Sequence, residues 1–148
     1  MVLKNIFLLS FFIQFSLFLS AQNISMDQTL TYINGKLAGK YTLDVKNGSL
    51  LVTAFKEEKK MMEEVILISD LDEQVIYSAE EGSLIMKCTE GDKCVQRKEY
   101  LVEKKNYFSR VKIVTPTDER SVKGLQNAFL HMIKLVHIPK YKNAEPFE

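Results

Sequence analysis

The segment from Asp118 to Val136 has the clearest helix pattern of the chain beyond its first 21 residues. Its apolar residues recur at spacings of three and four, which places them on one face of an α-helix. Thr117 or Asp118 can cap the first turn, and Pro139 ends the helix. The apolar stripe consists of Val122, Leu125, Ala128, Phe129, Met132, Ile133 and Val136. This stripe must be covered, and most preceding segments have the two-residue period of strands. We therefore predict an α+β domain, an antiparallel seven-stranded β-sandwich or partly open barrel closed by this C-terminal helix.

The first 21 residues have the pattern of an export signal. Lys4 gives a positive start, an apolar run extends over Ile6–Leu19, and Leu19-Ser20-Ala21 ends in a small residue suited to cleavage. A membrane anchor is the alternative, but the run is shorter than the ~20 residues that cross a bilayer. We predict a signal peptide at 1–21, a single globular domain at 22–138 and a C-terminal tail at 139–148. The protein is then exported, periplasmic or secreted, with no stable membrane insertion after signal cleavage.

The charge balance argues against one class of partner. The chain has 20 Lys and Arg residues against 19 Asp and Glu residues. Lys4 is the one basic residue of the predicted signal peptide, so the mature chain has as many basic as acidic residues. Nucleic-acid binding depends on a strongly basic face. We therefore predict no nucleic-acid partner.

A short N-terminal helix is predicted at the start of the domain. Ser25 and Gln28 have the spacing of a capping box, and Gly39 lies where such a helix would end. Leu30, Ile33 and Leu37 fall on one face of it.

A β-hairpin follows this helix. Asn47-Gly48 separates two alternating segments, and this dipeptide favours a type I′ turn because both positions need positive φ. The turn fixes a register in which apolar residues face one another: Tyr41 with Ala54, Leu43 with Val52, and Val45 with Leu50. Leu51 and Phe55 then point to the other face of the hairpin, where we expect the N-terminal helix to cover them.

Five more strands are predicted between this hairpin and the final helix, at 61–69, 74–78, 83–88, 95–102 and 107–114. A charged turn at Lys56–Lys60 precedes them. The run from Val65 to Ile68 contains no polar residue, which is typical of a strand covered on both faces.

Two cysteines, Cys88 and Cys94, lie at the ends of neighbouring predicted strands around Glu90-Gly91-Asp92. In an exported protein so close a pair indicates a disulfide. Opposed hairpin positions have Cα separations of about 4.5–5.5 Å, which a disulfide accepts. A redox or metal pair is disfavoured, because redox motifs usually separate their cysteines by two residues and no further thiol completes a zinc site.

Little in the sequence suggests catalysis or metal binding. His131 and His137 are six positions apart, so on one helix they point in different directions and cannot share a metal. Asp70, Asp72 and Glu73 lack the glycine and distal glutamate of a calcium loop, which favours a solvated turn. There is no serine-nucleophile elbow, phosphate loop or zinc-protease motif. We predict no catalytic residue, no metal and no cofactor.

Seven antiparallel strands ended by an amphipathic helix resemble the pleckstrin-homology-like fold. The chain is also similar to small uncharacterised exported proteins of Gram-negative bacteria, in its Cys88–Cys94 segment, its closing helix over Asn127–Leu135 and its Glu145-Pro146-Phe147 tail. The resemblance implies no activity. Phosphoinositide binding does not carry over, because the loop between the first two strands is only Asn47-Gly48.

Three functions remain open. The first is a non-catalytic module that binds a protein or another ligand, with Leu51, Phe55, His131 and Met132 as candidate surface residues. The second is a carrier of a small apolar ligand between sheet and C-terminal helix, which would need a pocket lined by Tyr41, Met62, Met86 and Met132. The third is a hydrolase with an unrecognised site, which would need a cleft joining His131 to carboxylates of raised pKa.

Overall fold

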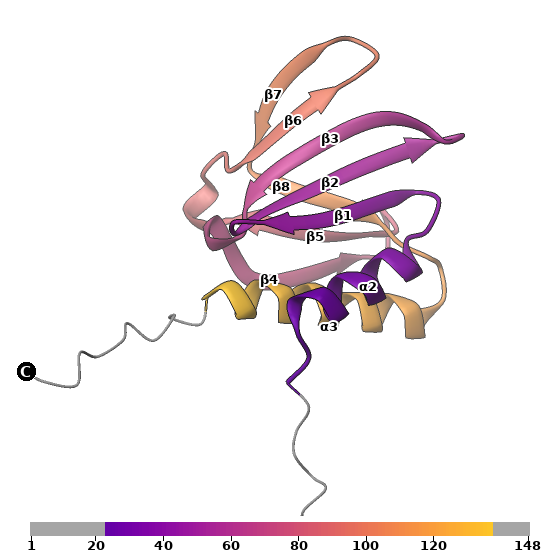
Figure 1. The fold of residues 1–148 in the computed structure, drawn as a ribbon, viewed down its shortest axis with the longest axis vertical. Helices are drawn as coiled ribbons and strands as arrows, with labels where there is room; N and C mark the ends of the chain where they lie inside the picture. The colour runs from indigo at the N-terminus through magenta and orange to yellow at the C-terminus, as the bar shows by residue number, and fades with distance from the viewer. Residues whose placement is uncertain (1–22, 138–148) are drawn as a thin grey trace, which may run out of the picture.

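The computed structural model describes residues 23–137. These residues form two antiparallel sheets that pack against each other, with two helices side by side along one side of them (Figure 1). This arrangement confirms the predicted α+β sandwich with a short N-terminal and a longer C-terminal helix. The described residues contain eight strands rather than seven, and their sheets do not close into a barrel.

The five-stranded sheet has the order β1-β2-β3-β6-β7, with the bounds β1 Tyr41–Lys46, β2 Ser49–Lys56, β3 Lys59–Leu67, β6 Val95–Glu99 and β7 Lys104–Phe108. The three-stranded sheet has the order β4-β5-β8, with the bounds β4 Leu71–Ser78, β5 Ser83–Cys88 and β8 Arg110–Val114. Two short 3₁₀ turns lie where the chain changes sheet, η2 (Ile68–Asp70) before β4 and η3 (Thr89–Gly91) before β6. The helices are α2 (Met26–Lys36) and α3 (Glu119–His137).

Both helices begin where capping residues predict. At α2 the Gln28 N–H donates to the Ser25 hydroxyl oxygen (3.2 Å), and the Gln28 side chain accepts from the Ser25 N–H (2.9 Å). At α3 the Ser121 N–H donates to the Asp118 carboxylate (2.8 Å). These bonds satisfy N–H groups that have no partner inside the helix.

The first hairpin has the predicted register. Tyr41 lies opposite Ala54, Leu43 opposite Val52 and Val45 opposite Leu50. The turn residues Asn47 and Gly48 have φ values of 52° and 77°, as a type I′ turn requires. The next turn is tighter than the predicted Lys56–Lys60 loop, since only Glu57 and Glu58 separate β2 from β3.

The core lies between the two sheets and α3. Leu125, Phe129, Met132 and Ile133 of α3 are completely buried, which confirms the orientation predicted from the apolar stripe. They belong to one buried cluster with residues of both sheets and of α2, among them Ile33, Leu50, Val52, Ile66, Leu84, Met86 and Ile113.

The strand predicted at 107–114 is in fact two strands. The chain leaves the five-stranded sheet after Phe108 and enters the three-stranded sheet at Arg110, so Ser109 is the point at which it changes sheet. The predicted strand at 95–102 is correspondingly shorter: β6 ends at Glu99, and the turn that joins it to β7 includes Glu103, with φ 46°.

The expectation that the N-terminal helix covers Leu51 and Phe55 is wrong. Leu30, Ile33 and Leu37 belong to the buried cluster of Leu43, Leu50 and Val52, which point to the opposite face of the sheet. Helix α2 therefore packs toward the inner face, and Leu51 and Phe55 stay half-buried on the outer face.

Candidate functional site

The outer face of the five-stranded sheet is the face that points away from the three-stranded sheet, and it carries a row of side chains that is mostly apolar. Leu51 of β2 lies opposite Val65 of β3, Val65 lies opposite Gln96 of β6, and Gln96 lies opposite Tyr107 of β7. Because directly opposed residues share a face, these side chains lie in one row across the sheet. Phe55 lies on the same face as Leu51, four residues further along β2, and Leu67 lies on the same face as Val65, two residues further along β3.

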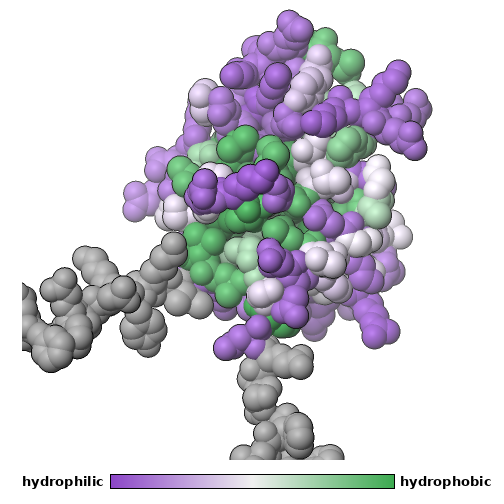
Figure 2. Space-filling model, in the orientation of Figure 1, coloured by the Kyte–Doolittle hydropathy of each residue, from purple (hydrophilic) through white to green (hydrophobic). Residues whose placement is uncertain are grey.

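Several of these side chains are uncovered within the described residues. Val65 is 42% exposed, Leu67 51% and Tyr107 58%, whereas Leu51 and Phe55 are half-buried. The prediction that β3 is covered on both faces is therefore wrong for Val65 and Leu67. Figure 2 shows hydrophobic surface over the middle of the molecule, crossed by one hydrophilic stretch and bordered by hydrophilic surface.

The inner face of the same sheet contains a buried ion pair. Glu64 of β3 is fully buried, and its Oε1 accepts hydrogen bonds from Arg97 Nε (2.7 Å) and Nη2 (2.6 Å). Arg97 also stacks on Phe108, with its guanidinium carbon 4.0 Å from the ring centre. The second oxygen of Glu64, Oε2, has no hydrogen-bond partner among the described residues. Burial raises the pKa of Glu64 above its usual value, against the opposing hydrogen bond and charge of Arg97.

His131 lies in a groove between α2 and α3 with a volume of about 540 Å³. Its Nε2 is 2.8 Å from the Ile24 carbonyl oxygen. The other residues that line the groove are Gln28, Thr29, Tyr32, Gly124, Asn127 and Ala128, and none of them is acidic. Met132, which we had also assigned to the candidate surface, is completely buried and contributes to no surface site.

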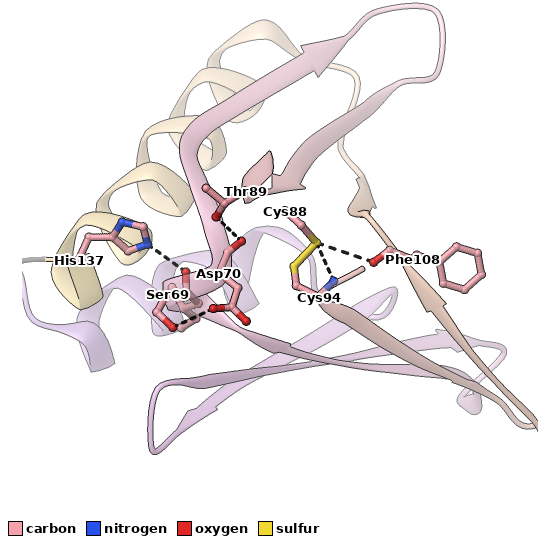
Figure 3. Close-up of a disulfide and its surroundings, with 8 residues drawn as sticks. Ser69, Asp70, Cys88, Thr89, Cys94, Phe108 and His137 are labelled. Carbon is pink, nitrogen blue, oxygen red and sulfur yellow. Dashed lines mark hydrogen bonds between the residues drawn. A yellow bond between two sulfur atoms is a disulfide. The ribbon is translucent and has the colours of Figure 1, made fainter. Parts of the chain in front are cut away.

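Cys88 and Cys94 form the predicted disulfide, with a Cα–Cα distance of 5.8 Å. Figure 3 shows the bond beside η3, with the Cys94 N–H donating to Cys88 Sγ at 3.1 Å. The prediction that the two cysteines lie opposite each other in a hairpin is wrong. They join strands of different sheets, because β5 belongs to the three-stranded sheet and β6 to the five-stranded sheet. The disulfide therefore fixes the point at which the chain crosses between sheets.

The C-terminal end of α3 is held close to this crossing. His137 Nε2 is 3.1 Å from the Ile68 carbonyl oxygen (Figure 3). His137 Nδ1 is 3.1 Å from Glu73 Oε1. Thr89 of η3 donates a hydrogen bond of 2.7 Å to the Asp70 carbonyl oxygen. These contacts connect α3, η2 and η3, so His137 has a structural role and does not approach His131.

The geometry required for a carrier or a hydrolase is not found among the described residues. Met86 and Met132 are completely buried in the core, and neither lines the groove at His131, the pocket at Tyr77 and Gln126 or the pocket at Asp72 and Arg110. Glu64, whose pKa is raised, lies inside the sandwich and not beside His131. No group of three or more His, Cys, Asp or Glu side chains in the described region is arranged to hold a metal ion.

Sequence reasoning identified Leu51 and Phe55 but missed Val65, Leu67 and Tyr107. A strand without polar residues has the same sequence pattern whether its second face is covered by the same chain or by another molecule. The register could have indicated the arrangement, because the residue opposite Leu51 must share its face.

Comparison with known proteins adds no relative. No protein-family model, no curated protein and no solved structure matches this chain. Among residues 23–137, no helix is both long enough and apolar enough to span a bilayer.

Proposed function

We propose that this protein is an exported, non-catalytic protein-interaction module that docks partners on the outer face of its five-stranded sheet. The observation that carries the proposal is the exposure of Val65 and Leu67 in a strand whose sequence is typical of coverage on both faces. Export is supported by the signal-like pattern of residues 1–21 and by the disulfide, since disulfides persist in oxidising compartments.

The composition of the face fits an interface. The outward face of a solvated antiparallel sheet is ordinarily polar, whereas this one has an apolar row through its middle. Around that row the same face carries Thr42, Asp44, Glu63 and Lys98. An apolar centre with a polar rim is the usual anatomy of a protein–protein interface.

Site-specific photo-crosslinking tests the proposal. A photoreactive amino acid would replace Val65 in one variant and Ile76 of the three-stranded sheet in the other, a matched control because the two residues are 42% and 41% exposed. The protein would be produced in its host and irradiated there. We expect a discrete cross-linked partner from position 65 and none from position 76.

A second pair of variants tests whether the cross-link depends on this face. Leu67→Glu places a charge among the exposed apolar residues, and Leu101→Glu places the same charge in the β6–β7 turn, where Leu101 is 79% exposed. The position-65 cross-link should disappear with Leu67→Glu and persist with Leu101→Glu. Equal cross-linking from positions 65 and 76, or none from either, would contradict the proposal.

A further inference from the structure

The edge strands of the two sheets differ in how their outward backbone groups are satisfied. Strand β1 is an edge of the five-stranded sheet, and its Leu43 N–H and C=O point away from β2. The Asn34 side chain of α2 binds both groups, accepting from the N–H at 2.7 Å and donating to the C=O at 2.8 Å. This side chain occupies the position of a neighbouring strand and blocks further pairing there.

Each edge of the three-stranded sheet has one backbone group bound by a side chain. At β4 the Gln126 Nε2 of α3 donates to the Val75 carbonyl oxygen at 2.7 Å. At β8 the Val114 N–H donates to the Tyr41 hydroxyl oxygen at 3.2 Å. An approaching strand would have to displace these side chains.

Strand β7 is the remaining edge. The Tyr100 N–H bonds to the Met61 carbonyl oxygen across the β3–β6 pair, and strand alternation then directs the backbone groups of Lys105 and Tyr107 away from β6. Among the hydrogen bonds of residues 23–137, no side chain binds those groups. Figure 1 shows the β6–β7 hairpin projecting from the sandwich, with its outer edge uncovered by other described elements.

The charge beside this edge is positive. Lys105 of β7 lies directly opposite Lys98 of β6 on the outer face, whereas Lys104 lies opposite Glu99 on the other face. Directly opposed like charges destabilise a strand pair. Lys98 has Glu63 of β3 on its other side, whereas Lys105 has no ion-pair partner among the described residues. A carboxylate placed next to Lys105 would relieve this repulsion.

We infer that the free edge of β7 binds an extended acidic segment of a partner protein, which adds a sixth strand to the five-stranded sheet. This inference rests on the interaction function proposed above and names the partner's chemistry. The backbone of the added strand pairs with Lys105 and Tyr107, and a carboxylate on its outward face lies beside Lys105. Its remaining outward residues extend the apolar row at Tyr107.

The test uses two synthetic peptides, one alternating glutamate and threonine and the other alternating lysine and threonine. Binding to the disulfide-intact protein would be measured by titration with observation of backbone amide NMR signals. We expect the glutamate peptide to bind and to slow hydrogen exchange at the Lys105 and Tyr107 amides. We expect the lysine peptide to bind at least about tenfold more weakly.

Three variants separate the backbone from the charge contribution. Tyr107→Pro removes an N–H that points away from β6, so the β6–β7 pair should tolerate the substitution. The affinity for the glutamate peptide should fall at least about tenfold, because the added strand loses that hydrogen bond. Tyr107→Thr keeps the N–H and controls for loss of the ring, so the amides should remain protected. Lys105→Glu should reverse the preference between the two peptides.

The outcomes distinguish this inference from the proposed function. If folded Tyr107→Pro binds the glutamate peptide like the wild type, the edge is not the site. If neither peptide binds while position 65 still cross-links a partner, the interaction function stands and the edge inference fails. A dimer that Tyr107→Pro abolishes would mean that a second copy of this chain occupies the edge, which also overturns the inference.

Discussion

The hydroxyl of Tyr32 lies against the backbone of Gly124, in space that the Cβ of any other residue at position 124 would need. This contact joins α2 to α3 beside the groove that contains His131. Glycine inside a helix is destabilising by roughly 0.5–1 kcal/mol relative to alanine. Glycine at position 124 therefore allows the two helices to approach closely but lowers the helix propensity of α3.

Gly124→Ala should therefore behave differently in two backgrounds. In a Tyr32→Ala background the new methyl group meets no ring, and the substitution should stabilise the protein by about 1 kcal/mol through helix propensity. In the wild-type background Tyr32 must move, which should cancel that gain or reverse it. Urea denaturation of the four proteins gives the coupling energy. Equal effects in both backgrounds would show that Tyr32 does not constrain position 124.

Phe129→Ala tests α3 as the cover of the core. Phe129 is completely buried between the sheets and α3, so truncation leaves a cavity and should lower the free energy of unfolding by about 3–5 kcal/mol. Lys134→Ala lies on the exposed face of the same helix and should change it by less than about 0.5 kcal/mol. Chemical denaturation measures both. A wild-type midpoint for Phe129→Ala would show that this side chain does not support the core.

Removal of the disulfide should destabilise the protein without altering its fold. Cys88 and Cys94 close a loop of about seven residues, for which the chain-entropy model gives about 2.4 kcal/mol. We expect that loss in the Cys88→Ala, Cys94→Ala double variant, with a wild-type circular dichroism spectrum. Peptide mapping of non-reduced material should recover one peptide pair that contains both cysteines. Two freely alkylated thiols in protein from its host would contradict the bond.

Local patterns predicted those parts of the fold that local interactions determine. The Asn47-Gly48 turn fixed the first hairpin register because few other residues accept positive φ twice. The same conformation occurs at Glu57 and Glu58, with φ values of 50° and 62°, where the sequence carries no such signal. That turn is imposed by the pairing of β2 with β3 and could not be recognised from its own residues.

The change of sheet at Ser109 has a weak signal in the sequence. Phe108 packs against the core from β7, and Val111 and Ile113 are buried from β8. Within one strand, residues 108 and 111 would point to opposite faces. Both instead contact the core, because the chain turns between the sheets. A break in the two-residue period therefore marks the crossing. The exposure of Val65, in contrast, depends on what packs against the outer face of β3, and the sequence of the strand carries no signal for it.

Glu64→Gln should change how stability depends on pH. Burial raises the folded-state pKa of this carboxyl, so the folded protein holds the proton more tightly than the unfolded chain does. The stabilisation from the protonated form is complete below the unfolded pKa of about 4.3 and is lost as the pH rises through the folded pKa. Glutamine does not ionise and keeps the hydrogen bond to Arg97. The variant should therefore become more stable relative to the wild type as the pH rises from about 4 to about 7.

Asp118→Asn provides a control of opposite sign. Hydrogen bonds from Ser121 lower the pKa of Asp118, so its contribution to stability is present above the unfolded pKa and is lost as the pH falls through the folded pKa. This variant should become less stable relative to the wild type as the pH rises from the lowered folded pKa of Asp118 to its unfolded pKa of about 3.9, with little further change at higher pH. Urea denaturation of the three proteins at a series of pH values measures both slopes. If Glu64→Gln followed the same slope as Asp118→Asn, attraction to Arg97 would outweigh burial, and the buried pair would stabilise the sheet instead of costing it stability.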